Sequence, residues 1–209
     1  MNLAIDVASG EKPIEELVGG AIKSLSLNDD VNLILVGGEK NISRALSKLK
    51  YDKNRIDIKH TNQIIDMNES PAVGIKHKKY ASVLVAARLV SNKEAEGFFS
   101  PGNTGATLAA ALTEVGRIKG VMRPPLVSTL PKIGGEFCMM DMGANVDCTP
   151  DYIAQFAVMG RVFAKRFLKI NNPRVALLNI GEENSKGNAE TKKFFERLEK
   201  VKKINFVGN

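Results

Sequence analysis

The chain has 209 residues, of which 44% are hydrophobic and 25% are charged, which is enough apolar material for one large or two small globular cores. Its formal net charge of +7 favours acidic partners: nucleic acid, an anionic membrane surface or an acidic protein. Aromatic residues make up only 6%, too few for a base-stacking platform, and no RNA-binding motif is present, so nucleic-acid binding is not expected.

Other features limit the class of protein. No uncharged apolar stretch approaches the roughly 18 residues of a membrane-spanning helix. The strand-like residues 3–5 leave no room for a signal peptide. Cys138 and Cys148 form no CxxC pair and have no matching set of His ligands. We therefore expect a reduced, cytoplasmic protein in which both cysteines are packing residues.

The first sixty residues predict alternating strands and helices. Residues 3–7 are apolar enough for a central strand, and residues 31–36 form a second strand that two glycines close. Residues 55–60 alternate with period two, which predicts an edge or half-buried strand. The helix that Pro13 opens has an apolar face at 3,4,3 spacing. That face consists of Ile14, Leu17, Val18, Ala21, Ile22 and Leu25.

The middle of the chain predicts a long helix, a short strand and another helix. Pro71 starts the long helix, which runs to about Val90 and carries a solvated basic cluster. Residues 96–99 read as the end of a short buried strand. After the loop at 100–105, the side chains of Leu108, Leu112 and Val115 recur at helical spacing and predict the inward face of the next helix.

The last ninety residues predict a hairpin followed by alternating elements. Residues 126–130 and 136–141 flank Pro-Lys-Ile-Gly-Gly, which indicates an antiparallel hairpin. A helix over 150–168, a buried strand over 174–180, a charged helix ending near Glu199 and a final strand complete the order. This order predicts one α/β domain over residues 1–209, with a doubly wound, mostly parallel but mixed sheet between two helical layers.

The candidate site follows from this topology. The loops at the carboxyl ends of the strands of a doubly wound sheet gather along one edge. That edge would collect four groups of residues: Asp6 with Gly10; Asn103, Thr104 and Gly105; Asp141 with Asn145 and Asp147; and Glu182 with Lys186, Gly187 and Asn188. They offer amide donors, one ammonium and several carboxylates, but no serine elbow, no Cys–His pair and no metal-ligand cluster. Such a site holds and polarises an anion.

Two parts of this site carry an alternative interpretation. The break at Pro-Gly before Asn103-Thr-Gly105 exposes backbone N–H groups at a helix start, which favours an anion site. A plain strand-to-helix turn, capped by Asn or Thr, fits the same residues. Lys186 lies in a glycine-bounded loop after a buried strand, where it suits the point charge of a phosphate site. A surface tether is the other interpretation.

Five motifs, taken together, resemble the PlsX-type phosphate acyltransferases of bacterial phospholipid synthesis. The resemblance covers essentially the whole chain, and the order and spacing of the motifs match. The motifs are Glu69-Ser-Pro-Ala72 with Lys78-Lys79, Gly102-Asn-Thr-Gly-Ala106, Gly116-Arg-Ile-Lys-Gly120 with Arg123-Pro124, Asp141-Met-Gly-Ala-Asn-Val-Asp-Cys148, and Asn179-Ile-Gly-Glu-Glu183 with Lys186-Gly-Asn188.

The resemblance implies an enzyme without a cofactor or metal that moves a long-chain acyl group from acyl-carrier protein to inorganic phosphate, giving acyl phosphate. It also implies a cytoplasmic homodimer at the inner membrane surface, which supplies an acyl-phosphate glycerol-3-phosphate acyltransferase, and a fold like isocitrate and isopropylmalate dehydrogenases. Phosphate is the nucleophile in such a reaction, so the protein has to orient it and stabilise the oxyanion.

Residue roles follow from this chemistry as hypotheses. Asn103, Thr104 and Gly105 bind phosphate, and Gly102, Asp6 and Gly10 belong to the same site. Lys186, with Asn188 nearby, neutralises phosphate or the oxyanion, while Asp141 and Asn145 orient the others. The acidic carrier protein gives the positive charge a use. The residues of this chain that we expect to dock the carrier protein are Arg161, Lys165, Arg166 and Arg123.

The chain departs from the family pattern in two loops. It has Asp6-Val-Ala-Ser-Gly-Glu11 where Asp-Ala-Met-Gly-Gly-Asp is typical, and Ser-Pro-Gly at 100–102 where Ser-Ala-Gly is usual. Family chains also continue beyond this last strand, so we expect a fragment that lacks the usual C-terminal part. Alternative functions are a non-catalytic module that binds acyl-carrier protein or a membrane partner, a short-chain phosphate acyltransferase, and a decarboxylating dehydrogenase of the same fold.

Overall fold

The computed structural model describes residues 1–209, which divide into two compact units, residues 1–116 and residues 117–209. The organisation into a single domain stays a prediction. No helix combines the length and the apolar composition needed to cross a membrane.

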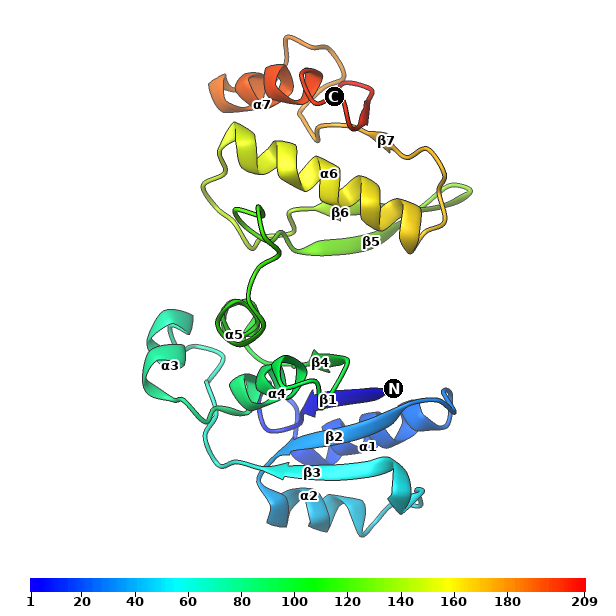
Figure 1. The fold of residues 1–209 in the computed structure, drawn as a ribbon, viewed down its shortest axis with the longest axis vertical. Helices are drawn as coiled ribbons and strands as arrows, with labels where there is room; N and C mark the ends of the chain where they lie inside the picture. The colour runs from blue at the N-terminus through cyan, green and yellow to red at the C-terminus, as the bar shows by residue number, and fades with distance from the viewer. The chain divides into compact units, whose positions relative to one another are not determined.

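The first unit is built on a four-stranded parallel sheet with the strand order β3-β2-β1-β4 (Figure 1). The strands are β1 (Asn2–Asp6), β2 (Asn32–Gly37), β3 (Ile56–His60) and β4 (Gly97–Phe99), and a short 3-10 turn (Lys53–Arg55) precedes β3. β1 lies between two neighbours and β3 is at an edge, as predicted. The expectation of a buried strand at residues 96–99 is wrong, because β4 is the other edge strand: its residues are only partly covered, and Phe99 is 58% exposed.

Alternation along β2 separates the two faces of this sheet. Leu33 and Leu35 pack with the inward sides of α1 (Ile14–Leu25) and α2 (Glu39–Leu46). Ile34 and Val36 belong to the cluster formed with α4 (Ser82–Ser91) on the opposite face. Figure 1 shows α1 and α2 on one side of the sheet and α4 on the other. The predicted apolar face of α1 is confirmed, because all six of its residues join the first cluster.

The single helix predicted from Pro71 to Val90 is wrong. The structure has two helices, α3 (Pro71–His77) and α4, which the segment 78–81 separates. Contacts with the loop after β3 explain the break. The Thr61 hydroxyl donates to the Tyr80 carbonyl, and the N–H of Tyr80 donates to Oε1 of Gln63 at 3.0 Å. These bonds draw the chain out of helical geometry.

The predicted inward face of α5 (Thr104–Ala110) is also wrong. Ala106 and Ala110 are buried against α3 and α4, whereas Leu112 and Val115, in the wider helical turn Ala111–Val115, are 37% and 49% exposed. Leucine and valine fit the spacing equally well, but the short alanines let α5 approach its neighbours closely. Side-chain size therefore decides this face.

The second unit contains the predicted hairpin, β5 (Val127–Lys132) with β6 (Gly135–Met140), which pairs antiparallel. It also contains α6 (Pro150–Arg166) and α7 (Ala189–Glu199), close to their predicted bounds. β7 (Arg174–Val175) pairs in parallel with β8 (Asn205–Phe206).

The buried strand predicted over residues 174–180 is mostly wrong. Only Arg174 and Val175 pair with another strand, and Leu178 and Ile180 are 76% and 86% exposed. Beyond β7 the N–H of Leu177 still donates to the carbonyl of Gly208 at 2.9 Å, but residues 178–180 form no backbone hydrogen bond to another strand. The fold class is nevertheless confirmed. Every strand pair is parallel except β5–β6, and the main sheet lies between helices.

Candidate functional site

In the first unit, the structure brings together the loops that follow β1 and β4, because these strands are parallel neighbours. Asp6 is fully buried at their junction. Its Oδ1 accepts the N–H groups of Ala8 and Ser9 at 3.1 and 3.2 Å, and its Oδ2 accepts the hydroxyls of Ser9 and, at 2.8 Å, Ser100. Asp6 therefore ties the two loops to each other, and its carboxylate is occupied by protein donors.

The glycines of these loops permit contact between protein segments. Gly10 has φ +102°, and a Cβ there would lie 3.0 Å from the carbonyl oxygen of Pro101. A Cβ at Gly102 would lie 2.5 Å from Oγ of Ser9. Ser9 therefore fills the space beside Gly102 that a side chain would need. Gly105 is similar, since its Cβ would meet the ring of Pro71 at 2.7 Å.

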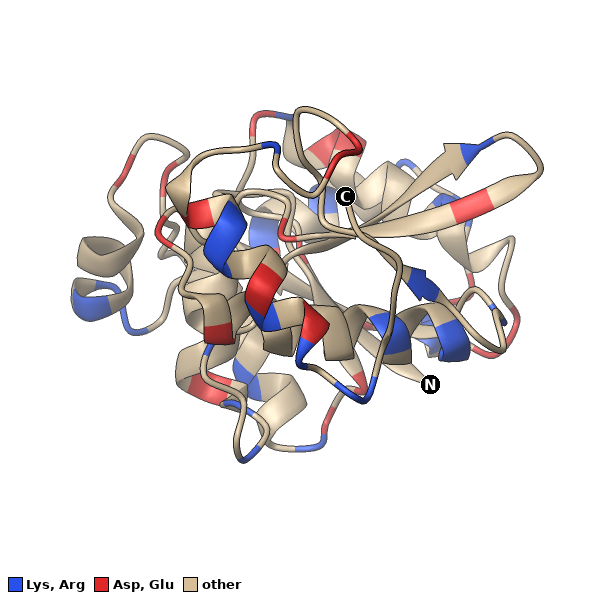
Figure 2. Cartoon of the chain, turned by 90° about the horizontal axis from the view of Figure 1, so that it is seen from above, with Lys and Arg blue, Asp and Glu red and all other residues tan.

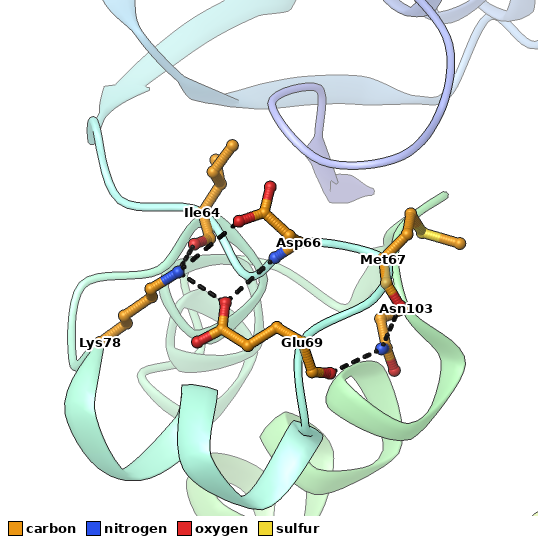
Figure 3. A network of polar contacts seen from close by, with 6 residues as sticks. All are labelled: Ile64, Asp66, Met67, Glu69, Lys78 and Asn103. Atoms are coloured by element: carbon orange, nitrogen blue, oxygen red, sulfur yellow. Dashed lines mark hydrogen bonds and ion pairs between the residues drawn. The ribbon is translucent and has the colours of Figure 1, made fainter.

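Asn103 is the N-cap of α5, one of the two caps, Asn103 or Thr104, that the sequence allowed. Its Oδ1 accepts the N–H of Ala106 at 3.0 Å, and its Nδ2 donates to the carbonyls of Met67 and Glu69 at 2.9 and 3.2 Å (Figure 3). The side chain is therefore fully used within the protein. What Asn103 can offer an anion is its backbone N–H.

The backbone N–H groups of Asn103, Thr104 and Gly105 have no acceptor within the protein. Thr104 and Gly105 are exposed. Three free donors at the start of a helix, where the peptide dipoles concentrate positive charge, form an arrangement that binds oxyanions. This part of the predicted site therefore has the groups that the chemistry needs.

The loop that precedes α3 contacts the start of α5, and the sequence analysis did not predict this contact. Nζ of Lys78 lies 2.6 Å from Oε2 of Glu69 and donates to the carbonyl of Ile64 at 2.8 Å (Figure 3). Oε2 of Glu69 also accepts the N–H of Asp66 at 3.3 Å. We call these four residues, Ile64, Asp66, Glu69 and Lys78, the Lys78 network. The hydrogen bond from Lys78 lowers the pKa of Glu69 below its ordinary value, against a smaller opposing effect of desolvation.

The network and the cap share one residue, because the backbone carbonyl of Glu69 accepts from Asn103. Glu69 and Lys78 were noticed in the sequence only as parts of a family motif. Their separation of nine residues matches neither helical nor strand spacing. The break between α3 and α4 places Lys78 against the preceding loop, and the sequence pattern did not reveal that break.

In the second unit, Asp141 and Asn145 form one turn after β6. Oδ1 of Asp141 accepts the N–H of Leu126 at 2.6 Å, and its Oδ2 accepts the N–H of Asn145 at 2.6 Å. Nδ2 of Asn145 donates to Asp141 and to the carbonyl of Pro124, both at 3.2 Å. The pair therefore joins two segments of the chain, and its expected role in orienting substrate groups stays a prediction.

Lys186 and Asn188 lie in a second loop of that unit. Nζ of Lys186 is 3.7 Å from a carboxylate oxygen of Glu183, and the lysine side chain is 46% exposed. Oδ1 of Asn188 caps α7 by accepting the N–H groups of Glu190 and Thr191 at 3.0 and 2.9 Å. No hydrogen bond or ion pair links Lys186 directly to Asp141. Lys186 is thus accessible, whereas the oxygen of Asn188 is already engaged.

The expected docking residues are exposed or half-buried cations. Lys165 and Arg166 are exposed at the end of α6, Arg161 is half-buried, and none of the three forms an ion pair. The guanidinium of Arg123 lies over the ring of Tyr152, 5.6 Å from its centroid. Figure 2 shows that basic and acidic residues are otherwise interspersed along the helices and loops.

The two cysteines lack the features of nucleophiles. Burial raises the pKa of the Cys138 thiol, and burial, followed by the charge of Asp141, raises that of Cys148. A raised pKa keeps a thiol protonated at neutral pH. No group of three or more His, Cys, Asp or Glu side chains is arranged to hold a metal ion.

Comparison with known proteins first shows the fold. The fold resembles EutD phosphotransacetylase from Staphylococcus aureus, with a TM-score of 0.66 and 18% identity over 100% of this chain and 67% of the other. It also resembles a 4-hydroxythreonine-4-phosphate dehydrogenase from Burkholderia phymatum, with a TM-score of 0.54 and 14% identity over 99% of this chain and 73% of the other. The predicted dehydrogenase-like α/β fold is confirmed.

The family follows from sequence. The model of the family described as "Fatty acid synthesis protein" matches residues 1–209, and the chain belongs to this family. It is 81% identical over 209 residues to a protein from Brachyspira hyodysenteriae that is named phosphate acyltransferase. The match covers 100% of this chain and 62% of that relative's length.

Proposed function

We propose that this chain carries the phosphate acyltransferase activity for which its relatives are named. In the proposed reaction a long-chain acyl group moves from acyl-carrier protein to inorganic phosphate, and the product is acyl phosphate. Family membership supports the reaction class, and the resemblance of the five motifs supports the donor and the product.

The observation that carries this proposal is the set of free N–H groups at Asn103, Thr104 and Gly105. Phosphate bound there would be held by backbone donors, whose positions the cap of Asn103 and the Lys78 network fix. Such donors need no reorganisation when the reaction begins, which is the basis of electrostatic preorganisation.

The chemistry requires no side-chain nucleophile. An oxygen of hydrogen phosphate attacks the carbonyl carbon of the thioester and forms a C–O bond. The tetrahedral intermediate then collapses, the C–S bond breaks, and the departing thiolate takes the proton that phosphate carried. Lys186 would neutralise the phosphate or the oxyanion, and its 46% exposure leaves it accessible to a substrate. The raised pKa values of both cysteines agree with this mechanism.

The partners belong to the same proposal. Arg161, Lys165, Arg166 and Arg123 would dock the acidic carrier protein, which agrees with the absence of ion pairs at the three residues of α6. By resemblance to its family, the protein would act as a cytoplasmic homodimer at the inner membrane. There it would hand acyl phosphate to a glycerol-3-phosphate acyltransferase.

The test is to incubate the 209-residue chain with acyl-carrier thioester and phosphate, and to measure both the acyl phosphate and the free carrier thiol. We expect the two products in equal amounts, and only when phosphate is present. Carrier protein that binds tightly while no acyl phosphate forms would contradict the catalytic proposal. It would favour the alternative of a non-catalytic binding module.

A further inference from the structure

The second unit contains a cavity of about 340 Å³ among β6, α6, α7 and the segment that follows β7. Its size is within the range of small-molecule sites in proteins. Its walls are mostly apolar, and two of the side chains that line it, Phe156 and Leu198, are only 3% and 2% exposed. The cavity is therefore framed by the core of this unit.

A glycine of α6, Gly160, leaves part of the cavity space unfilled. Gly160 lies in the interior of the 17-residue helix α6, where glycine costs about 1 kcal/mol relative to alanine. A Cβ at this position would meet only Sδ of Met140, at the ordinary contact distance of 3.6 Å. Packing therefore does not require a glycine, and any larger side chain at Gly160 would take up space in the cavity.

The cavity also connects the two groups of predicted catalytic residues in this unit. Asp141, which anchors the turn with Asn145, lines the cavity. Thr191 also lines it and donates its N–H to Oδ1 of Asn188, at 2.9 Å. Arg161 lines the same space and forms no ion pair, so a positive charge is available there.

We propose that this cavity binds the acyl chain of the donor substrate. Arg161, one of the residues proposed to dock the carrier protein, would mark the end of the cavity where the acyl group joins the carrier. This inference rests on the proposed function, since it supplies a site for the acyl group that the reaction transfers. The apolar lining suits a hydrocarbon chain. The flexible side chains of Met139 and Met140 allow the walls to adapt to it.

A binding experiment tests the cavity without relying on catalysis. The chain contains no tryptophan, so Phe194→Trp places a single fluorescent reporter on the cavity wall. The probe is a series of saturated fatty acids from octanoate to palmitate, whose carboxylate stands in for the thioester carbonyl. We expect a blue shift of the emission on binding, with affinity rising about fourfold for each added methylene until the cavity is full. Phe99→Trp, in the first unit, is the control and should not respond.

A pair of substitutions on α6 tests the location. Gly160→Leu, in the Phe194→Trp background, should weaken palmitate binding about tenfold or more while octanoate is less affected, because added volume shortens the space for the chain. Val162→Leu lies on the same helix at a position that is 49% exposed and outside the cavity, and it should change neither affinity. Ala157→Leu provides a second cavity-filling variant if Gly160→Leu does not fold.

Equal palmitate affinity in Gly160→Leu and Val162→Leu, or affinity that does not depend on chain length, would overturn this proposal. The outcome is separable from that of the proposed function, because phosphate binding at Asn103–Gly105 is measured independently. Chain-length-dependent binding that Gly160→Leu weakens supports the cavity even if phosphate binds elsewhere. If phosphate binds at those three residues and fatty acids do not bind at all, only the cavity assignment is wrong.

Discussion

Glu69 meets Asn103 through its backbone and Lys78 through its side chain. Its carbonyl oxygen accepts from Nδ2 of Asn103 at 3.2 Å, while its carboxylate accepts from Nζ of Lys78 at 2.6 Å. The same residue thus anchors the cap of α5 and closes the Lys78 network (Figure 3). The position of the free N–H groups at the start of α5 therefore depends on an ion pair that touches none of them.

Removing the lysine should loosen the helix start. Lys78→Met leaves Glu69 without its cation and Ile64 without its donor, so we expect phosphate affinity to fall about twofold to thirtyfold, the range for mutations that act through connected contacts. Calorimetric titration with phosphate measures the change. Lys76→Met removes an exposed charge from α3 that forms no ion pair and should leave the affinity unchanged. Equal effects of the two variants would contradict a positioning role for Lys78.

The ionisation of Glu69 should make the stability of the first unit depend on pH. Its pKa in the folded protein lies below the ordinary value of 4.5, so folding favours the carboxylate. The stabilisation is fully present above pH 4.5 and is lost as the pH falls through the lower, folded value. Urea unfolding across this range should find Glu69→Gln less stable than the parent at neutral pH, with a difference that shrinks in acid. A difference that does not vary with pH would exclude this carboxylate as the cause.

Lys186 tests the charge that the proposed mechanism needs. Losing one preorganised group that stabilises an oxyanion costs about 3–4 kcal/mol, so Lys186→Ala should reduce turnover about a hundredfold or more. Lys192→Ala removes an exposed lysine of α7 that forms no ion pair and serves as the matched control. Turnover of Lys186→Ala within a few-fold of the parent would remove this residue from the mechanism.

The basic end of α6 should bind acyl-carrier protein electrostatically. The affinity should fall steeply with added salt, and reversing the charges of Lys165 and Arg166 to Glu should weaken both the affinity and its salt dependence. Surface plasmon resonance across a salt series measures both quantities. Lys48→Glu is the control, because it reverses an exposed charge in the turn that follows α2. Carrier binding that is indifferent to ionic strength would place docking on another surface.

The sequence predicted what depends on local pattern and missed what depends on side-chain contacts far along the chain. The 3,4,3 spacing located α1 and its buried face, and Asn103 was one of two residues expected to cap α5. In α5, spacing could not distinguish the leucines from the alanines. Burial there depends on how closely α5 approaches α4.

For the site, the sequence predicted which loops contribute but not how their side chains are used. Asp6 and Asp141 were expected near a ligand, yet both carboxylates are occupied by protein N–H or hydroxyl groups. The Lys78 network was missed because it forms only where the chain breaks between α3 and α4. Neither feature leaves a periodic pattern in the sequence.

Phosphate binding at the start of α5 is tested most directly by NMR titration of the 15N-labelled chain. We expect inorganic phosphate to shift the amide signals of Asn103, Thr104 and Gly105. Thr104→Pro removes one N–H at the first helical position, where proline is tolerated, and should weaken binding about tenfold to a hundredfold. Thr104→Ser keeps the N–H and should bind phosphate like the parent. Shifts confined to other residues, or undiminished binding by Thr104→Pro, would contradict the proposed site.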